Sequence, residues 1–253
     1  MSRTRYDARV RSIALLGRDW TELGPLALAE LPDGGALALS RGVYPKAYAH
    51  TDPNEDAALL VRTAGGALLA VADGFNGTRA SELAVERVRA RAEELLAASG
   101  EGFRAALARV AADVRAALPA RSRSRSCLVV AALGAERCEL ASLGDSNAFV
   151  AGDPNPLARQ NSLLLGNPEP LPQGRAELFH WPVARAAGAR IALVSDGVTN
   201  FVDDLSRIPR LLAESASDAD AARAIAELAF AGGAGDNVGV AVFAGRAGAG
   251  ELR

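Results

Sequence analysis

The chain has 253 residues and a net charge of −2 at neutral pH, from 28 basic and 30 acidic side chains. That length allows one large domain or two small ones with a substantial apolar core. The near balance of charge gives no indication of a nucleic-acid-binding or membrane-binding surface, and no apolar stretch in the sequence is long enough to span a membrane.

The two cysteines, Cys127 and Cys138, lie in apolar runs of the kind that form buried strands. Two buried free thiols are the expected state of such residues, and free thiols fit a reducing compartment. The apolar run near the N-terminus is too short for the core of a signal peptide. We therefore expect a cytoplasmic protein.

Residues 1–35 contain a short apolar run at 13–16 and little other regular pattern. We expect them to form an N-terminal extension packed on a domain of residues 36–253. That domain begins with a predicted strand at 36–40, which leads into an irregular segment.

Two short apolar runs at residues 57–62 and 67–72 are separated by the glycine-containing residues 63–66, and this pattern predicts a β-hairpin. A hairpin brings the start of its first strand beside the end of its second. Asp56 and Asp73 occupy these two positions, so we expect their carboxylates to lie close together.

Apolar residues at helical spacing predict two consecutive helices, at residues 78–98 and 103–118. The second ends at a proline, which cannot continue a helix. Two successive helices of similar length are expected to form an antiparallel layer over a sheet. The basic run at 121–126 is either a phosphate-binding loop or a solvated loop, and its lack of interleaved aromatic residues favours the solvated loop.

The rest of the sequence predicts short strands and further helices. Three strands in an antiparallel meander are expected at residues 127–133, 137–142 and 147–151. After a long loop, the later elements are strands at 175–180, 190–194 and 238–243 and helices at 198–204, 208–214 and 218–229. Strands at both ends of the chain with paired helices between them favour an α+β fold of two sheets covered by helices.

Four aspartates share one kind of position, because each lies where a predicted strand begins or ends: Asp56, Asp73, Asp196 and Asp236. Carboxylate oxygens are the ligands that hard cations such as Mg²⁺ and Mn²⁺ prefer. Two such ions about 4 Å apart turn a bridging water into a nucleophile and stabilise charge on a phosphoryl group. A single Asp-Gly or Asp-Asn pair is most often a turn, so it is the ordered set of four that indicates a metal site.

Five segments of the sequence, in order, resemble the metal-dependent protein phosphatases of the protein phosphatase 2C type. The segments are Asn54-Glu55-Asp56-Ala57, Val71-Ala72-Asp73-Gly74-Phe75-Asn76-Gly77, Leu143-Gly144-Asp145-Ser146-Asn147-Ala148, Val194-Ser195-Asp196-Gly197-Val198-Thr199 and Gly235-Asp236-Asn237. The resemblance extends from about residue 36 to about residue 244, which is nearly the whole chain.

This resemblance implies an αββα four-layer sandwich, in which two antiparallel sheets are flanked by helix pairs. It also implies a bacterial-type Ser/Thr phosphatase that hydrolyses phosphoserine and phosphothreonine in proteins by attack of a metal-bridging hydroxide. The expected partners are a phosphorylated protein substrate and a cognate Ser/Thr kinase or its targets.

The resemblance implies two Mg²⁺ or Mn²⁺ ions as cofactors. Their expected ligands are the four aspartates, with Asp73 bridging both ions, and the Gly74 carbonyl. Glu55 is expected to act through waters and Asn237 to orient Asp236. Asp145 is expected to support the site more than to bind metal.

The sequence departs from the family where members usually carry an arginine that grips the substrate phosphate, because Thr51 stands there. Lys46, His50 and Arg41 are candidates to replace it, and Lys46, the one lysine of the chain, is the first choice.

There are two further departures. Phe75 stands where many eukaryotic members have a histidine that is a proposed general acid. At residues 125–127, Arg-Ser-Cys replaces the Gly-Thr-Thr that is common in the family. The second puts the family's third metal in doubt. These departures support an alternative hypothesis, a phosphatase-like module of weak or no activity that binds a phosphoprotein or a kinase.

Overall fold

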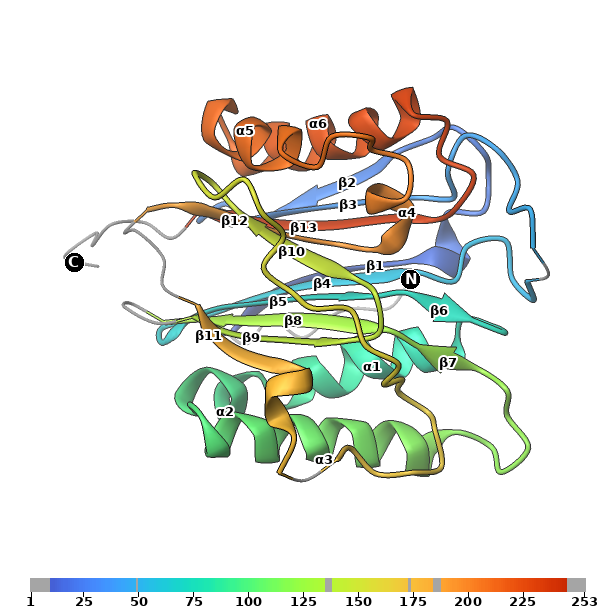
Figure 1. The fold of residues 1–253 in the computed structure, drawn as a ribbon, viewed down its shortest axis with the longest axis vertical. Helices are drawn as coiled ribbons and strands as arrows, with labels where there is room; N and C mark the ends of the chain where they lie inside the picture. Colours follow the sequence, from blue (N-terminus) through green and yellow to red (C-terminus); the bar gives the residue numbers. More distant parts are fainter. Residues whose placement is uncertain (1–9, 49, 135–137, 173, 184–187, 245–253) are drawn as a thin grey trace.

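Two antiparallel sheets lie face to face, and each has helices on its outer face (Figure 1). In this computed structural model the described residues are 10–244, apart from 49, 135–137, 173 and 184–187. The arrangement is the predicted α+β fold of four αββα layers. Among the described residues, no helix combines the length and the apolar character that crossing a membrane would require.

The first sheet has six strands. In order across the sheet they are β1 (Arg11–Leu16), β4 (Ala57–Thr63), β5 (Gly66–Ala72), β8 (Leu128–Leu133), β9 (Cys138–Leu143) and β11 (His180–Val183). The predicted hairpin at its centre is confirmed, since β4 and β5 pair with Ala57 opposite Ala72.

The second sheet has five strands, and a short ribbon accompanies the two sheets. In order across the sheet the strands are β10 (Asn147–Val150), β12 (Arg190–Val194), β13 (Val238–Ala244), β3 (Ala36–Ser40) and β2 (Ala27–Glu30). The ribbon consists of β6 (Gly74–Phe75) and β7 (Arg125–Ser126). The last strand of the described residues, β13, therefore lies in the middle of its sheet.

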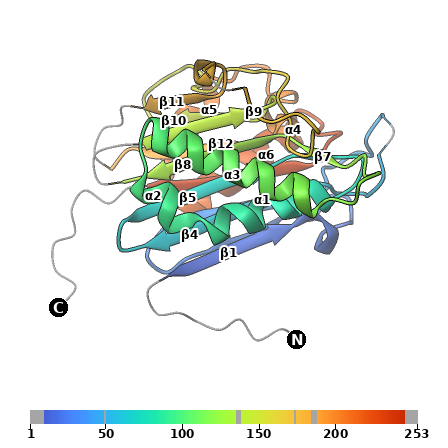
Figure 2. The same ribbon diagram turned by 90° about the horizontal axis from the view of Figure 1, so that it is seen from below.

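Helices cover the two outer faces. On the first sheet lie α1 (Arg79–Ala90), α2 (Ala92–Ala97) and α3 (Glu101–Ala117), which Figure 2 shows from below; on the second lie α4 (Asp196–Thr199), α5 (Arg207–Glu214) and α6 (Asp218–Ala231). Two short 3-10 turns, η1 (Gly17–Asp19) and η2 (Ala176–Leu178), complete the elements. The helix expected at 78–98 is broken at Arg91, where the backbone leaves helical geometry.

Three apolar layers hold the sandwich together. In β5, Leu68 and Ala70 pack toward α1–α3, while Leu69 and Val71 pack toward the second sheet. A third cluster joins the second sheet to α5 and α6. Both faces of each sheet are covered, so the strands of the two sheets are continuous apolar runs. This explains why apolar and polar residues show little alternation along these strands. Both cysteines are buried and in the thiol form, as predicted.

The expected meander is wrong at its third strand. β8 and β9 pair in the first sheet, but β10 pairs with β12 in the second. The turn at Gly144, which has a left-handed φ of 94°, lies between β9 and β10, where the chain passes from one sheet to the other. Short strand spacing predicts neighbouring strands but does not say in which sheet each one pairs.

The strand expected at 175–180 is also wrong, because η2 occupies much of that range and β11 begins only at His180. β11 is an edge strand, and this position accommodates Pro182, which has no N–H to donate.

The N-terminal segment contributes a strand to each sheet. β1 pairs with β4 and β2 pairs with β3, both antiparallel. The sheets therefore extend into residues 1–35, and the division of the chain at residue 36 stays a prediction.

Candidate metal centre

Five aspartates gather at one end of the sandwich, and each lies in a connection next to a strand or a helix. Asp56 precedes β4, Asp73 follows β5, Asp145 lies between β9 and β10, Asp196 begins α4, and Asp236 precedes β13. Figure 1 shows α4 and the β6–β7 ribbon at this same end. The negative charges of the other four all act on Asp73, which confirms that the fold brings them close together.

Two glycines allow the close backbone approach that this gathering needs. A Cβ atom on Gly197 would lie 1.9 Å from the Asn237 carbonyl oxygen, and one on Gly74 would lie 2.4 Å from the Glu55 carbonyl oxygen. The glycine after Asp196 therefore packs against the turn that carries Asp236. The glycine after Asp73 packs against the loop that carries Asp56, so both Asp-Gly pairs have a steric reason.

Burial and mutual repulsion make these carboxylates hard to ionise. Burial raises the pKa of Asp56 to about 7; the charge of Lys46 opposes this rise, and the charge of Asp236 adds to it. Burial, with Asp236 and Asp145 nearby, raises the pKa of Asp196 to about 6. The pKa of Asp73 rises well above its usual value through burial and the charges of its neighbours, Asp56 first. A cation placed among these groups would relieve the repulsion.

Asp56 is the carboxylate whose state best tests whether a metal fits. It is 1% exposed, and neither of its carboxylate oxygens has a hydrogen-bond partner among the described residues. A buried carboxylate without partners is costly, and divalent cations supply the missing interactions. The surrounding donors are carboxylate oxygens, which suit Mg²⁺ or Mn²⁺. The donor set therefore fits such an ion.

Asp236 has a different environment, because protein donors occupy both of its oxygens. The Lys46 ammonium lies 3.1 Å from Oδ1, the Asn237 N–H donates to Oδ1 at 2.7 Å, and the Tyr48 hydroxyl donates to Oδ2 at 2.7 Å. Burial opposes the charge on Lys46, but the charges of Asp56 and Asp236 outweigh it and raise the pKa of this lysine. Burial and the bond to Asp236 also raise the pKa of Tyr48.

Lys46, which the sequence assigns to the substrate phosphate, is buried inside the acidic cluster. Its side chain is 2% exposed, and its ammonium lies 3.5 Å from Glu55 Oε2 as well as close to Asp236. The second candidate, His50, is exposed, with Nδ1 3.0 Å from the Tyr48 carbonyl oxygen. The structure thus places both beside Tyr48, and their binding of substrate phosphate stays a prediction.

Glu55 and Asn237 fix the loops that carry the aspartates. Glu55 Oε1 accepts from the backbone N–H groups of Thr51, Asp52 and Gly77, at 3.2, 3.3 and 2.5 Å.

The Asn237 side chain accepts from the Glu55 N–H at 2.8 Å and donates to the carbonyls of Arg41 and Pro53. It therefore joins the turn of Asp236 to the loop of Asp56. The predicted contacts of these two residues with metal-bound waters stay predictions.

Asp145 and Cys127 are nearer the centre than the sequence analysis expected. Ligand atoms of Asp73, Cys127 and Asp145 all lie within 4.8 Å of one another, and the Cys127 sulfur is 3.1 Å from Asp145 Oδ1. Burial, and next the charge of Asp73, raise the pKa of the thiol, so it stays protonated. The signal for Asp145 was present in the sequence, because Gly144-Asp145 follows an apolar run as the other aspartates do.

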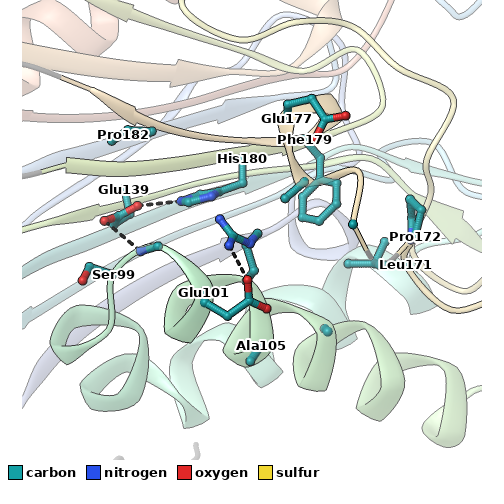
Figure 3. Close-up of a pocket in the computed structure, with 15 residues that line it drawn as sticks. Ser99, Glu101, Ala105, Glu139, Leu171, Pro172, Glu177, Phe179, His180 and Pro182 are labelled. Atoms are coloured by element: carbon teal, nitrogen blue, oxygen red, sulfur yellow. Dashed lines mark hydrogen bonds and ion pairs between the residues drawn. The ribbon is translucent and has the colours of Figure 1, made fainter.

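A cavity of about 1050 Å³ lies elsewhere, between α3 and β11. Its wall includes the pair of Glu139 and His180, whose side chains face each other in Figure 3. Glu139 Oε2 lies 2.6 Å from His180 Nε2. Glu139 stands near the start of β9 and Asp145 beyond its end, so the cavity is not part of the acidic centre.

The fold and the carboxylate cluster define the class of metal-dependent phosphoprotein phosphatases. A sequence model of the family described as Protein phosphatase 2C matches residues 45–230, and the chain belongs to this family. A comparison with curated proteins gives no match.

Solved bacterial phosphatases share the fold. The catalytic domain of the serine/threonine protein phosphatase PstP, in complex with two manganese ions, is 25% identical with a TM-score of 0.61; the likeness covers 87% of this chain and 99% of that one. MsPP from Mycobacterium smegmatis, in complex with cacodylate, is 22% identical with a TM-score of 0.63, covering 86% and 100%. A bacterial serine phosphatase is 20% identical with a TM-score of 0.67, covering 83% and 97%.

Proposed function

We propose that this protein is a Mg²⁺- or Mn²⁺-dependent phosphatase that hydrolyses phosphoserine and phosphothreonine in proteins. The observation that carries the proposal is Asp56, buried with both oxygens unpartnered among the described residues, within a cluster of like charges. Membership of the protein phosphatase 2C family supports the reaction class.

Two ions would be held by the four predicted aspartates, Asp56, Asp73, Asp196 and Asp236, together with the Gly74 carbonyl. When bound, these ions supply an activated water as nucleophile and positive charge for the phosphoryl oxygens. The manganese ions named for PstP, the relative that is 25% identical, support Mn²⁺ as one suitable ion.

The protein's own residues hold the centre in place. Glu55, through its three backbone hydrogen bonds, fixes the approach of Gly77 to the loop before Asp56. Asn237 fixes the turn of Asp236 against that loop. Lys46 and His50 remain our candidates for the substrate phosphate, since Thr51 offers no positive charge. Phe75 offers no proton for the leaving group.

The substrate is a phosphorylated protein, and a cognate Ser/Thr kinase or its targets are the proposed partners. We propose the cytoplasm as the site of action, which the thiol form of the two buried cysteines supports.

Mn²⁺-dependent hydrolysis of an aryl phosphate and of a phosphopeptide tests the proposal. Asp196→Asn should abolish both activities, because it removes one proposed ligand charge. The matched control is Asp153→Asn, since Asp153 lies after β10, at the far end of that strand from Asp145. Equal activity in Asp196→Asn and the wild type would overturn the site assignment.

The alternative of a binding module with little turnover is favoured by two observations, Thr51 at the phosphate-gripping position and Lys46 held in ion pairs. It predicts that the protein binds Mn²⁺ and retains a phosphopeptide without hydrolysing it. Release of phosphate from that peptide would exclude this alternative.

A further inference from the structure

Lys46 is a buried cation inside a site proposed for metal cations. It is the one lysine of the chain, and its side chain is 2% exposed. Lysine is rarely buried unless it is paired. Here its ammonium lies 3.1 Å from Asp236 Oδ1 and 3.5 Å from Glu55 Oε2, and 5.4 Å from the centre of the Tyr48 ring.

These contacts divide the acidic cluster into two unlike halves. Asp56 keeps both oxygens unpartnered among the described residues. Asp236 has Lys46 and the Asn237 N–H on Oδ1 and the Tyr48 hydroxyl on Oδ2. The charge of Lys46 acts on both aspartates, but it makes an ion pair only with Asp236 of the two. A cation that approached Asp56 would meet oxygens without a hydrogen-bond partner among the described residues, whereas one that approached Asp236 would meet oxygens already engaged by a positive charge and two hydrogen-bond donors.

We propose that the Lys46 ammonium competes with a divalent cation for Asp236, so that metal binding at this aspartate displaces the ion pair and Lys46 lowers the affinity of the centre for metal. The position of Lys46 gives the protein an internal counter-cation while no metal is bound. The inference rests on the metal-binding part of the proposed function, in which Asp236 is a ligand, and does not depend on whether the protein turns over a phosphorylated substrate.

Calorimetric titration with Mn²⁺ tests the competition directly. Lys46→Met removes the charge and keeps an apolar side chain of similar length. We expect it to bind Mn²⁺ at least about tenfold more tightly than the wild type, because one close charge pair carries a coupling of this size or more.

The matched control for this titration is Arg41→Met, which removes one positive charge from the same segment. The Arg41 guanidinium donates to the Thr21 carbonyl and forms no ion pair with a carboxylate of the described residues, so the affinity should change little. Unchanged or weaker Mn²⁺ binding by Lys46→Met would overturn the proposal, as would the absence of binding by both the wild type and the variant.

A second measurement uses the wild-type protein and therefore needs no variant to fold. Because the chain has one lysine, lysine-selective ¹³C labelling gives a single side-chain Cε signal, from Lys46. Addition of Mg²⁺ should change the chemical shift of this signal. The change at each Mg²⁺ concentration should match the fraction of protein that calorimetry shows to be bound. A signal that stays in place while Mg²⁺ saturates the protein would show that the ion pair persists, and the proposal would be wrong. Neither measurement uses phosphatase activity, so failure of the proposed function would be seen separately.

Discussion

Two buried acidic groups of this protein differ in what surrounds them. Glu139, in the cavity wall, has a partner on each oxygen: His180 at 2.6 Å and the Gly100 N–H at 3.3 Å, and His180 in turn stacks on Phe103. Asp56, in the acidic centre, has a partner on neither oxygen among the described residues. The cavity at Glu139 is large, but both carboxylate oxygens of Glu139 have hydrogen-bond partners. The proposed cation site is therefore identified by unsatisfied buried charge and not by the size of a hollow.

The largest expected effect would separate the two groups by activity. Asp56→Asn should lower the Mn²⁺-dependent hydrolysis of an aryl phosphate by about a hundredfold or more, because it removes one ligand charge. Glu139→Gln should leave that rate within about twofold, since the cavity lies outside the proposed metal centre. Steady-state kinetics of both variants measure the difference. A comparable loss in Glu139→Gln would place the cavity within the active site.

The next effect concerns stability in the absence of metal. Glu139→Ala leaves His180 buried without its partner and should lower the free energy of unfolding by about 3 kcal/mol. Asp56→Asn should not destabilise the metal-free protein, because it removes a buried charge that has no partner. Urea denaturation monitored by circular dichroism compares the two. A large loss of stability in Asp56→Asn would mean that protein groups already satisfy this carboxylate.

A smaller effect is a dependence on pH. The pKa of Asp56 is about 7 in the folded protein and near 4 in an unfolded chain, so between these values the folded state binds more protons. The contribution of Asp56 to stability is therefore present below about pH 4 and is lost as the pH rises to 7. We expect the metal-free wild type to lose about 1 to 3 kcal/mol more than Asp56→Asn across this range. Denaturation curves at several pH values measure it, and equal slopes would contradict the raised pKa.

The smallest effect lies at the rim of the cavity. Glu101 and Arg104 form an ion pair there, visible in Figure 3, and the Glu101 side chain is 85% exposed. Exposed pairs of this kind contribute little, so Glu101→Gln should change the free energy of unfolding by less than about 0.5 kcal/mol. A change as large as that of Glu139→Ala would show that the buried pair is not what holds this region together.

Most of the fold could be predicted from the sequence because local signals agreed with the tertiary structure. The glycine-containing turn at 63–66 placed the β4–β5 hairpin, and helical spacing placed α3 and α6 within a few residues. The sheet to which β10 belongs could not be predicted, because strand pairing depends on long-range packing and not on spacing along the chain. The break at Arg91 and the start of β11 were missed because the local pattern continues smoothly through both.

The candidate site was predictable in part, for a similar reason. The four predicted aspartates could be found because each lies at the beginning or the end of a predicted strand. In the structure they lie close enough for their charges to interact. The place of Lys46 follows no such rule, since residues 41–53 form an irregular segment whose path depends on the turn before β13. Cys127 and Asp145 were undervalued because their proximity to Asp73 arises from pairing between distant strands.

The position of β13 has a consequence for how the protein is made. It is the last described strand along the chain, yet it lies between β12 and β3, with Asp236 at its entrance. During synthesis from the N-terminus, the edge of β3 that pairs with β13 stays unpaired until β13 has been made. Only then can β13 join the β2–β3 hairpin to β12. A nascent chain that stops short of β13 therefore holds Asp56, Asp73 and Asp196 but neither a continuous second sheet nor the full set of proposed ligands. We expect metal binding at the proposed centre to require a chain that extends through β13.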